Sequence, residues 1–283
     1  LNTNKEVRHA GKIIDKKDGF SIINCESCGF YHLDPKPTDL ELRKFYEELY
    51  FQSHKSDYIK QDNLDNKYWE SVFSQRLKIC SKLSTGKKIL DIGCGSGMFL
   101  EYAKNEGWDC YGVEPSKSAY HIAREKDLNI VNSSFDDFAN NTLEKFNIII
   151  LKNVLEHLIN PIEVINKSFN LLEDKGLIFI EVPNDYNFLQ RFGTKFTNTE
   201  KNWIAIPDHI NYFNFSSLKK LLKSNNFQIV HRSTSFPIYA LLSMGLNFVD
   251  NKIHGSKAHE MRVNFELNYK GKIFKDLFYR LLS

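Results

Sequence analysis

Glycines stand at alternate positions, Gly93, Gly95 and Gly97, directly after a run typical of a buried strand. Glycine tolerates the positive φ of a sharp strand-to-helix turn, and it lets a ligand approach the backbone N–H groups that open a helix. Asp91 precedes the loop, and Glu114 ends the next apolar run. An acid at the second place commonly holds both hydroxyls of a ribose, so this spacing predicts a nucleoside-binding site.

The spacing of the glycines differs from a dinucleotide fingerprint. That fingerprint, G-x-G-x-x-G, would require a glycine where Met98 stands. A nicotinamide-dependent reductase or epimerase would share the sheet and the ribose acid, but it usually carries a Tyr-x-x-x-Lys pair, which this chain lacks. The loop therefore favours a nucleoside ligand and does not require a pyrophosphate.

An alternation of strands and helices is expected to position these residues. Apolar runs predict strands at 88–92, 109–113, 128–131, 146–151, 177–182 and 227–233, and helical patterns lie at 97–106, 117–126, 161–172 and 216–225. Strand, helix and strand in this order indicate a mostly parallel, doubly wound α/β sheet. Nearly continuous apolar strands such as 148–151 fit a sheet that is covered on both faces.

Three segments are expected along the chain. An N-terminal cap, 1–84, contains short strands and two helices, one starting at Thr38 with Glu41 as its capping partner and one at 64–83. A nucleotide-binding domain occupies 85–235, with a polar and aromatic insertion at about 184–213. A helical extension follows at 236–283.

The stretches 89-ILDIGCGSGMFL-100 and 111-YGVEPS-116 resemble the first two motifs of class I S-adenosylmethionine-dependent methyltransferases. The resemblance implies a Rossmann-like fold with a seven-stranded doubly wound sheet, S-adenosylmethionine as donor and S-adenosylhomocysteine as product. It places the three glycines, with Cys94 packed between them, under the methionine moiety, Asp91 near its amino group, and Glu114 on the ribose. The stretch 133-SSFDDF-138 matches the adenine-side loop, with Phe135 near the ring and Asp136 as acceptor for its amine.

The stretch 151-LKNVLEHLINP-161 resembles the L-E-H-x-x-x-P segment of ubiquinone-type and sugar methyltransferases. That resemblance places Asn153, Glu156 and His157 at the rim of the donor crevice. His157 is the first candidate for general base, because imidazole titrates near neutral pH. The alternative is a histidine that only bonds backbone groups.

The later stretch 203-WIAIPDHINYFNFSSLKKLL-222 matches a segment that covers the acceptor pocket in the same subgroup. His209 is the second base candidate, and Tyr212, Asn184 and Trp203 are expected on the acceptor side. The alternative for His209 and Tyr212 is a structural cluster, and Trp203 fits a pocket lid or core equally well.

The resemblance predicts an enzyme that methylates a hydroxyl of a small molecule or sugar, with surface glycan biosynthesis as the setting. The alternative is a non-catalytic S-adenosylmethionine-binding partner of another enzyme, which would keep the glycines and Glu114 but lose the acceptor pocket. The EH and DHINY stretches argue against that alternative. The identity of the acceptor stays open.

The N-terminal stretch around Cys25 and Cys28 resembles a four-cysteine zinc knuckle found before some of these domains, but only one C-x-x-C pair is present. Because structural zinc takes four ligands, His9 and His32 would have to complete the set. The sequence favours a degenerate knuckle without metal.

Composition excludes some partners. The formal net charge is +3, so no basic field indicates nucleic acid, and no apolar run reaches the roughly 18 residues of a membrane span. The five cysteines fit reduced thiols, and the N-terminus shows no secretory pattern, so a cytoplasmic bacterial protein is expected. The tail 270–282 is expected to dock on the core or a second subunit, or to touch a membrane surface; the oligomeric state stays open.

Overall fold

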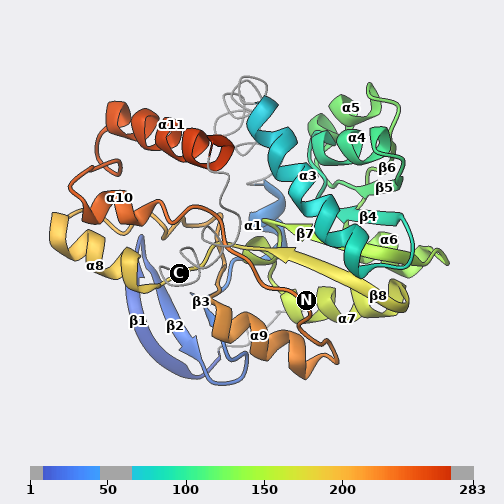
Figure 1. Cartoon of the computed structure of the whole chain (residues 1–283). Coiled ribbons are helices and arrows are strands. Elements are labelled where there is room, and N and C mark those ends of the chain that lie inside the picture. The colour runs from blue at the N-terminus through green and yellow to red at the C-terminus, as the bar shows by residue number, and fades with distance from the viewer. Residues whose placement is uncertain (1–8, 45–65, 269–283) are drawn as a thin grey trace. The chain divides into compact units, whose positions relative to one another are not determined.

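The computed structural model describes residues 9–44 and 66–268 (Figure 1). The chain forms two compact units. The parallel-sheet unit is Pro37–Val182, and the two-segment unit combines Leu1–Lys36 with Pro183–Ser283. The segment boundaries expected near residues 84 and 235 remain a prediction about domains.

A parallel sheet of five strands forms the centre of the parallel-sheet unit, in the order β6-β5-β4-β7-β8. The strands are β4 (Lys88–Ile92), β5 (Asp109–Val113), β6 (Asn129–Val131), β7 (Phe146–Lys152) and β8 (Leu172–Glu181). Along the chain, β4, β5 and β6 follow one another toward one edge of the sheet. β7 and β8 then extend the sheet toward the other edge. The strand order therefore reverses between β4 and β7, the place where open α/β sheets bind ligands.

Helices connect and flank these strands. They are α1 (Asp39–Lys44), α3 (Asn66–Leu83), α4 (Met98–Asn105), α5 (Lys117–Arg124), α6 (Phe135–Asn141) and α7 (Pro161–Leu171), with the short 3-10 helix η2 (Leu155–His157) after β7. Helix α4 packs on β5, α5 on β6 and α7 on β8. The core gathers apolar side chains of α3, α4, β4 and β7, including Phe73, Leu100, Ile89 and Ile148. This burial explains why the central strands are continuous apolar runs.

The two-segment unit contains an antiparallel sheet in the order β1-β2-β3-β9. Its strands are β1 (Gly11–Lys17), β2 (Phe20–Cys25), β3 (Tyr31–Asp34) and β9 (Asn211–Tyr212). Its helices are α8 (Phe188–Thr197), α9 (Phe215–Ser224), α10 (Tyr239–Ser243) and α11 (Lys252–Asn268). Tyr186, Trp203 and Tyr212 form its aromatic core together with Ile22 and Leu33.

The expected class I α/β architecture is present, but the strand count differs from seven. The described residues of the parallel sheet form five strands, and the run 227–233 forms none. Its two β-branched residues stay exposed, Ile229 at 41% and Val230 at 62%, and Phe227 is only partly buried. A run of β-branched residues without a buried face has little to hold it as a strand.

Two expectations fall outside the described residues. These are the part of the first helix beyond Lys44 and the tail at 270–282. Among the described residues, no helix is both long and apolar enough to cross a membrane.

Candidate active site

The glycine loop joins β4 to α4, and all three of its glycines have positive φ: 69° at Gly93, 57° at Gly95 and 74° at Gly97. A Cβ added at Gly97 would approach Leu128 Cδ1 to 2.6 Å, and one at Gly93 would approach Val154 Cγ2 to 2.9 Å. A Cβ at Gly95 would meet no described atom within 4 Å. The backbone at Gly95 therefore faces open space, where a ligand can lie against it.

Glu114, at the end of β5, holds the loop in place. Its Oε2 accepts from the backbone N–H of Gly95 and its Oε1 from that of Ser116, both at 2.8 Å. The side chain is buried. Because a carboxylate accepts more than two hydrogen bonds, these contacts are compatible with a ribose on the same group.

Asn132 is a supporting residue that the sequence analysis missed. Its side-chain amide donates to the backbone oxygens of Glu114 at 2.8 Å and Pro115 at 3.1 Å. It thereby fixes the chain that follows β5. Its position directly after β6, at the same edge of the sheet, was the available signal.

Asp91 lies in β4 with 6% of its surface exposed. Burial raises the pKa of its carboxyl to about 7; the charge of Lys152 works against this rise, Glu114 adds to it, and Arg76 also opposes it. The carboxyl therefore changes charge near neutral pH. Such a group suits the recognition of an ammonium, whose positive charge favours the ionised form.

The two cations near Asp91 were also missed. Arg76 of α3 donates through Nη2 to both carboxylate oxygens of Glu181, at 2.8 and 2.5 Å. Lys152, the last residue of β7, places its Nζ 4.5 Å from the centre of the Trp69 ring. A charged residue that ends a buried apolar strand, as Lys152 does, was a usable signal in the sequence.

The expected adenine-side loop begins α6. Phe135 is buried. Ser134 caps the helix by accepting from the backbone N–H of Asp137 at 3.1 Å. Asp136 forms an ion pair with Lys167 at 2.8 Å, and its side chain is half exposed. The roles of Phe135 and Asp136 toward adenine remain predictions.

Cys94 lies inside the loop as a packed residue. Burial raises the pKa of its thiol well above the ordinary value. A Cβ added at Gly112 of β5 would come within 2.8 Å of Cys94 Sγ. This close packing, with a protonated thiol, fits a small structural residue beside the donor loop.

The segment after β7 carries the first group of catalytic candidates. Asn153 has a φ of 51°, which asparagine tolerates, and its backbone N–H donates to Glu181 O at 2.8 Å. Glu156 is buried, and its Oε1 lies 3.8 Å from His157 Nε2. This separation exceeds a hydrogen bond but allows an ion pair once the imidazole is protonated.

The remaining candidates lie in the two-segment unit. The rings of His209 and Tyr212 are 6.4 Å apart between centroids. Trp203 and Tyr212 are buried in the aromatic core, and burial raises the pKa of Tyr212. Asn184 accepts through its backbone oxygen from the side chain of Asn187, the N-cap of α8, at 2.7 Å. For Trp203 and Tyr212 the structure supports packing, and their contact with an acceptor remains a prediction.

A five-stranded parallel sheet with a glycine loop after its first strand, and an acid bound to that loop after the second, defines a Rossmann-like nucleoside-binding fold. A family model described as a methyltransferase domain matches residues 65–232. This chain belongs to that family of methyltransferase domains. The resemblance to class I methyltransferases expected from the glycine loop is thereby confirmed.

Two curated relatives are ubiquinone biosynthesis O-methyltransferases. The protein from Glaesserella parasuis serovar 5 (strain SH0165) is 38% identical over 109 residues, covering 35% of this chain and 46% of the relative. The protein from Aliivibrio fischeri (strain MJ11) is 26% identical over 153 residues, covering 50% of this chain and 64% of the relative. The chain thus spans less than two thirds of either relative's length.

The solved structure of the plantazolicin methyltransferase BamL, in complex with a triazolic desmethylPZN analog and SAH, has a similar fold. Its TM-score is 0.50 at 16% identity, and the match covers 81% of this chain and 89% of that chain. At this identity the likeness establishes the fold and leaves the substrate of this chain to be derived from its own residues.

Proposed function

We propose that the protein transfers a methyl group from S-adenosylmethionine to a hydroxyl of a small molecule or sugar. The observation that carries the proposal is the pairing of Glu114 with the glycine loop. The carboxylate accepts from the N–H of Gly95, and a Cβ added at Gly95 would meet no described atom within 4 Å. This arrangement suits a nucleoside whose ribose meets the acid while its amino-acid part lies along the loop.

The residues present fit this donor. Asp91, whose pKa burial raises to about 7, offers a carboxylate to the donor's ammonium. Phe135 offers an apolar surface to adenine, and Asn153 lies at the carboxyl end of β7. When bound, the donor supplies a methyl group on a positively charged sulfur.

The acceptor oxygen has to be positioned in line with the methyl group and relieved of its proton. The carbon–sulfur bond breaks as the carbon–oxygen bond forms, and the hydroxyl proton passes to a base. His157 is the first candidate for this base, because the buried Glu156 beside it would stabilise the imidazolium formed. His209 is the second candidate.

The hydroxyl acceptor rests on the names of the two relatives and on the L-E-H segment that this chain shares with their group. A sugar acceptor rests on the sequence resemblance alone. Donor binding can therefore be tested independently of the identity of the acceptor.

Thermal unfolding with added ligands tests the donor. S-adenosylhomocysteine at about a hundred times its Kd should stabilise the fold by roughly 2.7 kcal/mol, enough to raise the Tm by several degrees. NAD and NADP should leave the Tm unchanged. Glu114→Ala should remove the shift, whereas Glu125→Ala, at an exposed site, should retain it.

A Tm increase with a dinucleotide would contradict the donor assignment. So would a Tm that none of these ligands raises. A shift with S-adenosylhomocysteine but no methylation of any phenol, hydroxylated quinone or sugar supplied with S-adenosylmethionine would favour the non-catalytic binding partner. The two measurements thus separate donor binding from catalysis.

A further inference from the structure

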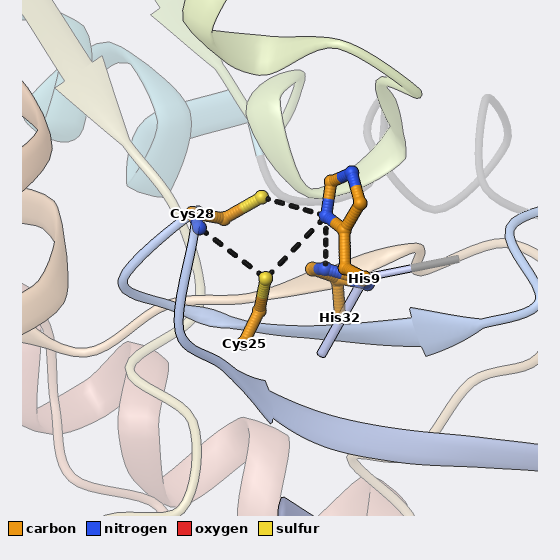
Figure 2. A group of neighbouring side chains, drawn as sticks. All are labelled: His9, Cys25, Cys28 and His32. Atoms are coloured by element: carbon orange, nitrogen blue, oxygen red, sulfur yellow. Dashed lines mark hydrogen bonds between the residues drawn. The ribbon is translucent and has the colours of Figure 1, made fainter. Parts of the chain in front are cut away.

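Four side chains with metal-binding atoms converge in the two-segment unit (Figure 2). Cys25 ends β2, Cys28 lies in the turn that follows, His32 belongs to β3, and His9 precedes β1. One ligand atom from each lies within 4.8 Å of those of the other three. Residues from three separate points of the first 32 positions therefore meet at one place.

The distances around His9 are close to the edges of a tetrahedral site. Its Nδ1 lies 3.4 Å from Cys25 Sγ, 3.2 Å from Cys28 Sγ and 3.2 Å from His32 Nε2. With Zn–S bonds of about 2.3 Å and Zn–N bonds of about 2.0–2.1 Å, tetrahedral angles separate neighbouring ligand atoms by roughly 3.3–3.8 Å. The three distances from His9 Nδ1 lie at or slightly below the lower end of this range, so small side-chain adjustments would place all four atoms around one ion.

Hydrogen bonding alone does not account for this convergence. A neutral imidazole nitrogen carries either one hydrogen or one lone pair, so His9 Nδ1 can satisfy only one of its three polar neighbours at a time. Cys25 is 2% and His32 is 1% exposed, so little water reaches these two side chains. A cation at the centre would engage all four groups at once.

The surroundings orient the ligand atoms. His32 Nδ1 lies 2.7 Å from Leu33 O, and because a carbonyl only accepts, Nδ1 carries the hydrogen. The lone pair of a neutral His32 is thereby on Nε2, the atom that faces the cluster. A backbone carbonyl on the far nitrogen is the usual support of a metal-binding histidine.

The turn between the cysteines is shaped in the same way. The backbone N–H of Cys28 donates to Cys25 Sγ at 3.2 Å, and that of Gly29 donates to Cys25 O at 3.0 Å. Gly29 has a φ of 75°, which brings the chain back into β3. The turn therefore presents both sulfur atoms to one side.

We propose that His9, Cys25, Cys28 and His32 bind one zinc ion. Two thiolates and two neutral imidazoles complete the four ligands of a structural zinc site and leave no open position for a reacting water. The ion would tie the chain before β1 to the β2–β3 turn. From the sequence, the single C-x-x-C pair favoured a knuckle without metal. The sequence could not place His9 and His32 beside the two cysteines, because only the antiparallel sheet brings them there.

Metal content of the full chain tests the proposal. The protein, equilibrated with zinc and separated from free metal, should hold about one zinc per chain by mass spectrometry of the element. Replacement by cobalt(II) should give the intense visible bands of a tetrahedral site and a near-ultraviolet thiolate charge-transfer band. The cobalt spectrum needs no variant, so it reports on the wild-type fold.

Matched variants locate the site. His9→Ala and Cys28→Ser should lose the bound zinc and the thiolate band, while the controls His231→Ala and Cys80→Ala should keep both. Circular dichroism verifies that each variant is folded. Wild-type protein without zinc or tetrahedral cobalt bands, or a folded His9→Ala variant with full zinc and an unchanged cobalt spectrum, would overturn the four-ligand assignment.

Discussion

The charge of Asp91 decides how the candidate donor site responds to pH. Its folded pKa of about 7 lies above the ordinary value of about 3.9, so the folded state holds a proton that the unfolded chain has released between these values. The resulting stabilisation is fully present below the ordinary pKa and is lost as pH rises through about 7. Donor binding should show the opposite trend, because an ammonium favours the carboxylate.

We therefore predict that the affinity for S-adenosylhomocysteine rises with pH up to neutrality. Below pH 7 it should fall by up to about tenfold per unit, the limit for one coupled proton. Titration calorimetry between pH 5.5 and pH 8 measures this slope. Asp91→Asn should bind weakly with little pH dependence, and a wild-type affinity independent of pH would contradict the role of Asp91.

The base candidates make a second prediction at this scale. His157→Ala should lower turnover by roughly 10²–10⁴-fold, the usual contribution of a positioned base, while the Kd for S-adenosylhomocysteine changes little. His209→Ala should behave in this way if it, and not His157, removes the proton. The exposed His121 provides the matched control in His121→Ala. Wild-type turnover in both candidate variants would mean that positioning alone supports the reaction.

Residue-level prediction was possible where the signal is local. Gly93, Gly95 and Glu114 could be singled out as candidates because the strand before each of them and the turn after it lie within a few residues. Arg76 and Lys152 were missed as neighbours of Asp91, since α3 and β7 bring them there from distant parts of the chain. A pKa set by burial and by distant charges has no counterpart in sequence spacing.

The glycine loop is the element whose function depends most on backbone shape. Gly95→Ala should cost about 1–2 kcal/mol of stability through its positive φ alone, because the added Cβ meets no described atom. Its methyl group should nevertheless obstruct the donor. We expect affinity for S-adenosylhomocysteine to fall by at least about tenfold, a loss of about 1.4 kcal/mol.

Gly107→Ala is the matched control for this variant. Gly107 also has positive φ, at 78°, and its added Cβ meets no described atom within 4 Å, but it follows α4 at the opposite end from the loop. It should lose similar stability, measured by denaturant unfolding, and keep full donor affinity. Equal affinities in the two variants would remove Gly95 from the donor site.

Among the elements, the strands of the parallel sheet were the most predictable. Residues 88–92 and 109–113 match β4 and β5, because a buried parallel strand is apolar along most of its length. The run 227–233 has the same local character, yet its Ile229 and Val230 remain exposed. Burial depends on what the rest of the chain places against a segment, so local propensity could not separate these cases.

At the scale of the whole molecule, the two units should exchange hydrogen as two groups. Backbone bonds join β1, β2, β3 and β9 in one sheet and β4 to β8 in the other. Hydrogen exchange in low denaturant should therefore release 11–34 together with 211–212, and the parallel strands as a separate set. Joint exchange of 11–34 with α3 would instead support the N-terminal cap expected at 1–84.

The sequence could not predict that Leu1–Lys36 and Pro183–Ser283 combine in one unit. In β3, Tyr31 pairs with Tyr212 of β9 and His32 with Asn211, and Leu33 N–H donates to Ile210 O at 2.9 Å. No local pattern links strands so far apart. The same pairing places a proposed zinc ligand next to the strand that carries Tyr212.

This pairing has a consequence for biosynthesis. The partner of Tyr31 is translated about 180 residues later, which at about 5–20 residues per second is a delay of roughly 10–40 s. During that interval the β3 edge on the nascent chain lacks β9, and an unpaired edge is prone to join foreign strands. A zinc ion bound by His9, Cys25, Cys28 and His32 would keep the emerging hairpin closed until β9 arrives, so the metal would serve the ribosome-bound chain before it serves the finished enzyme.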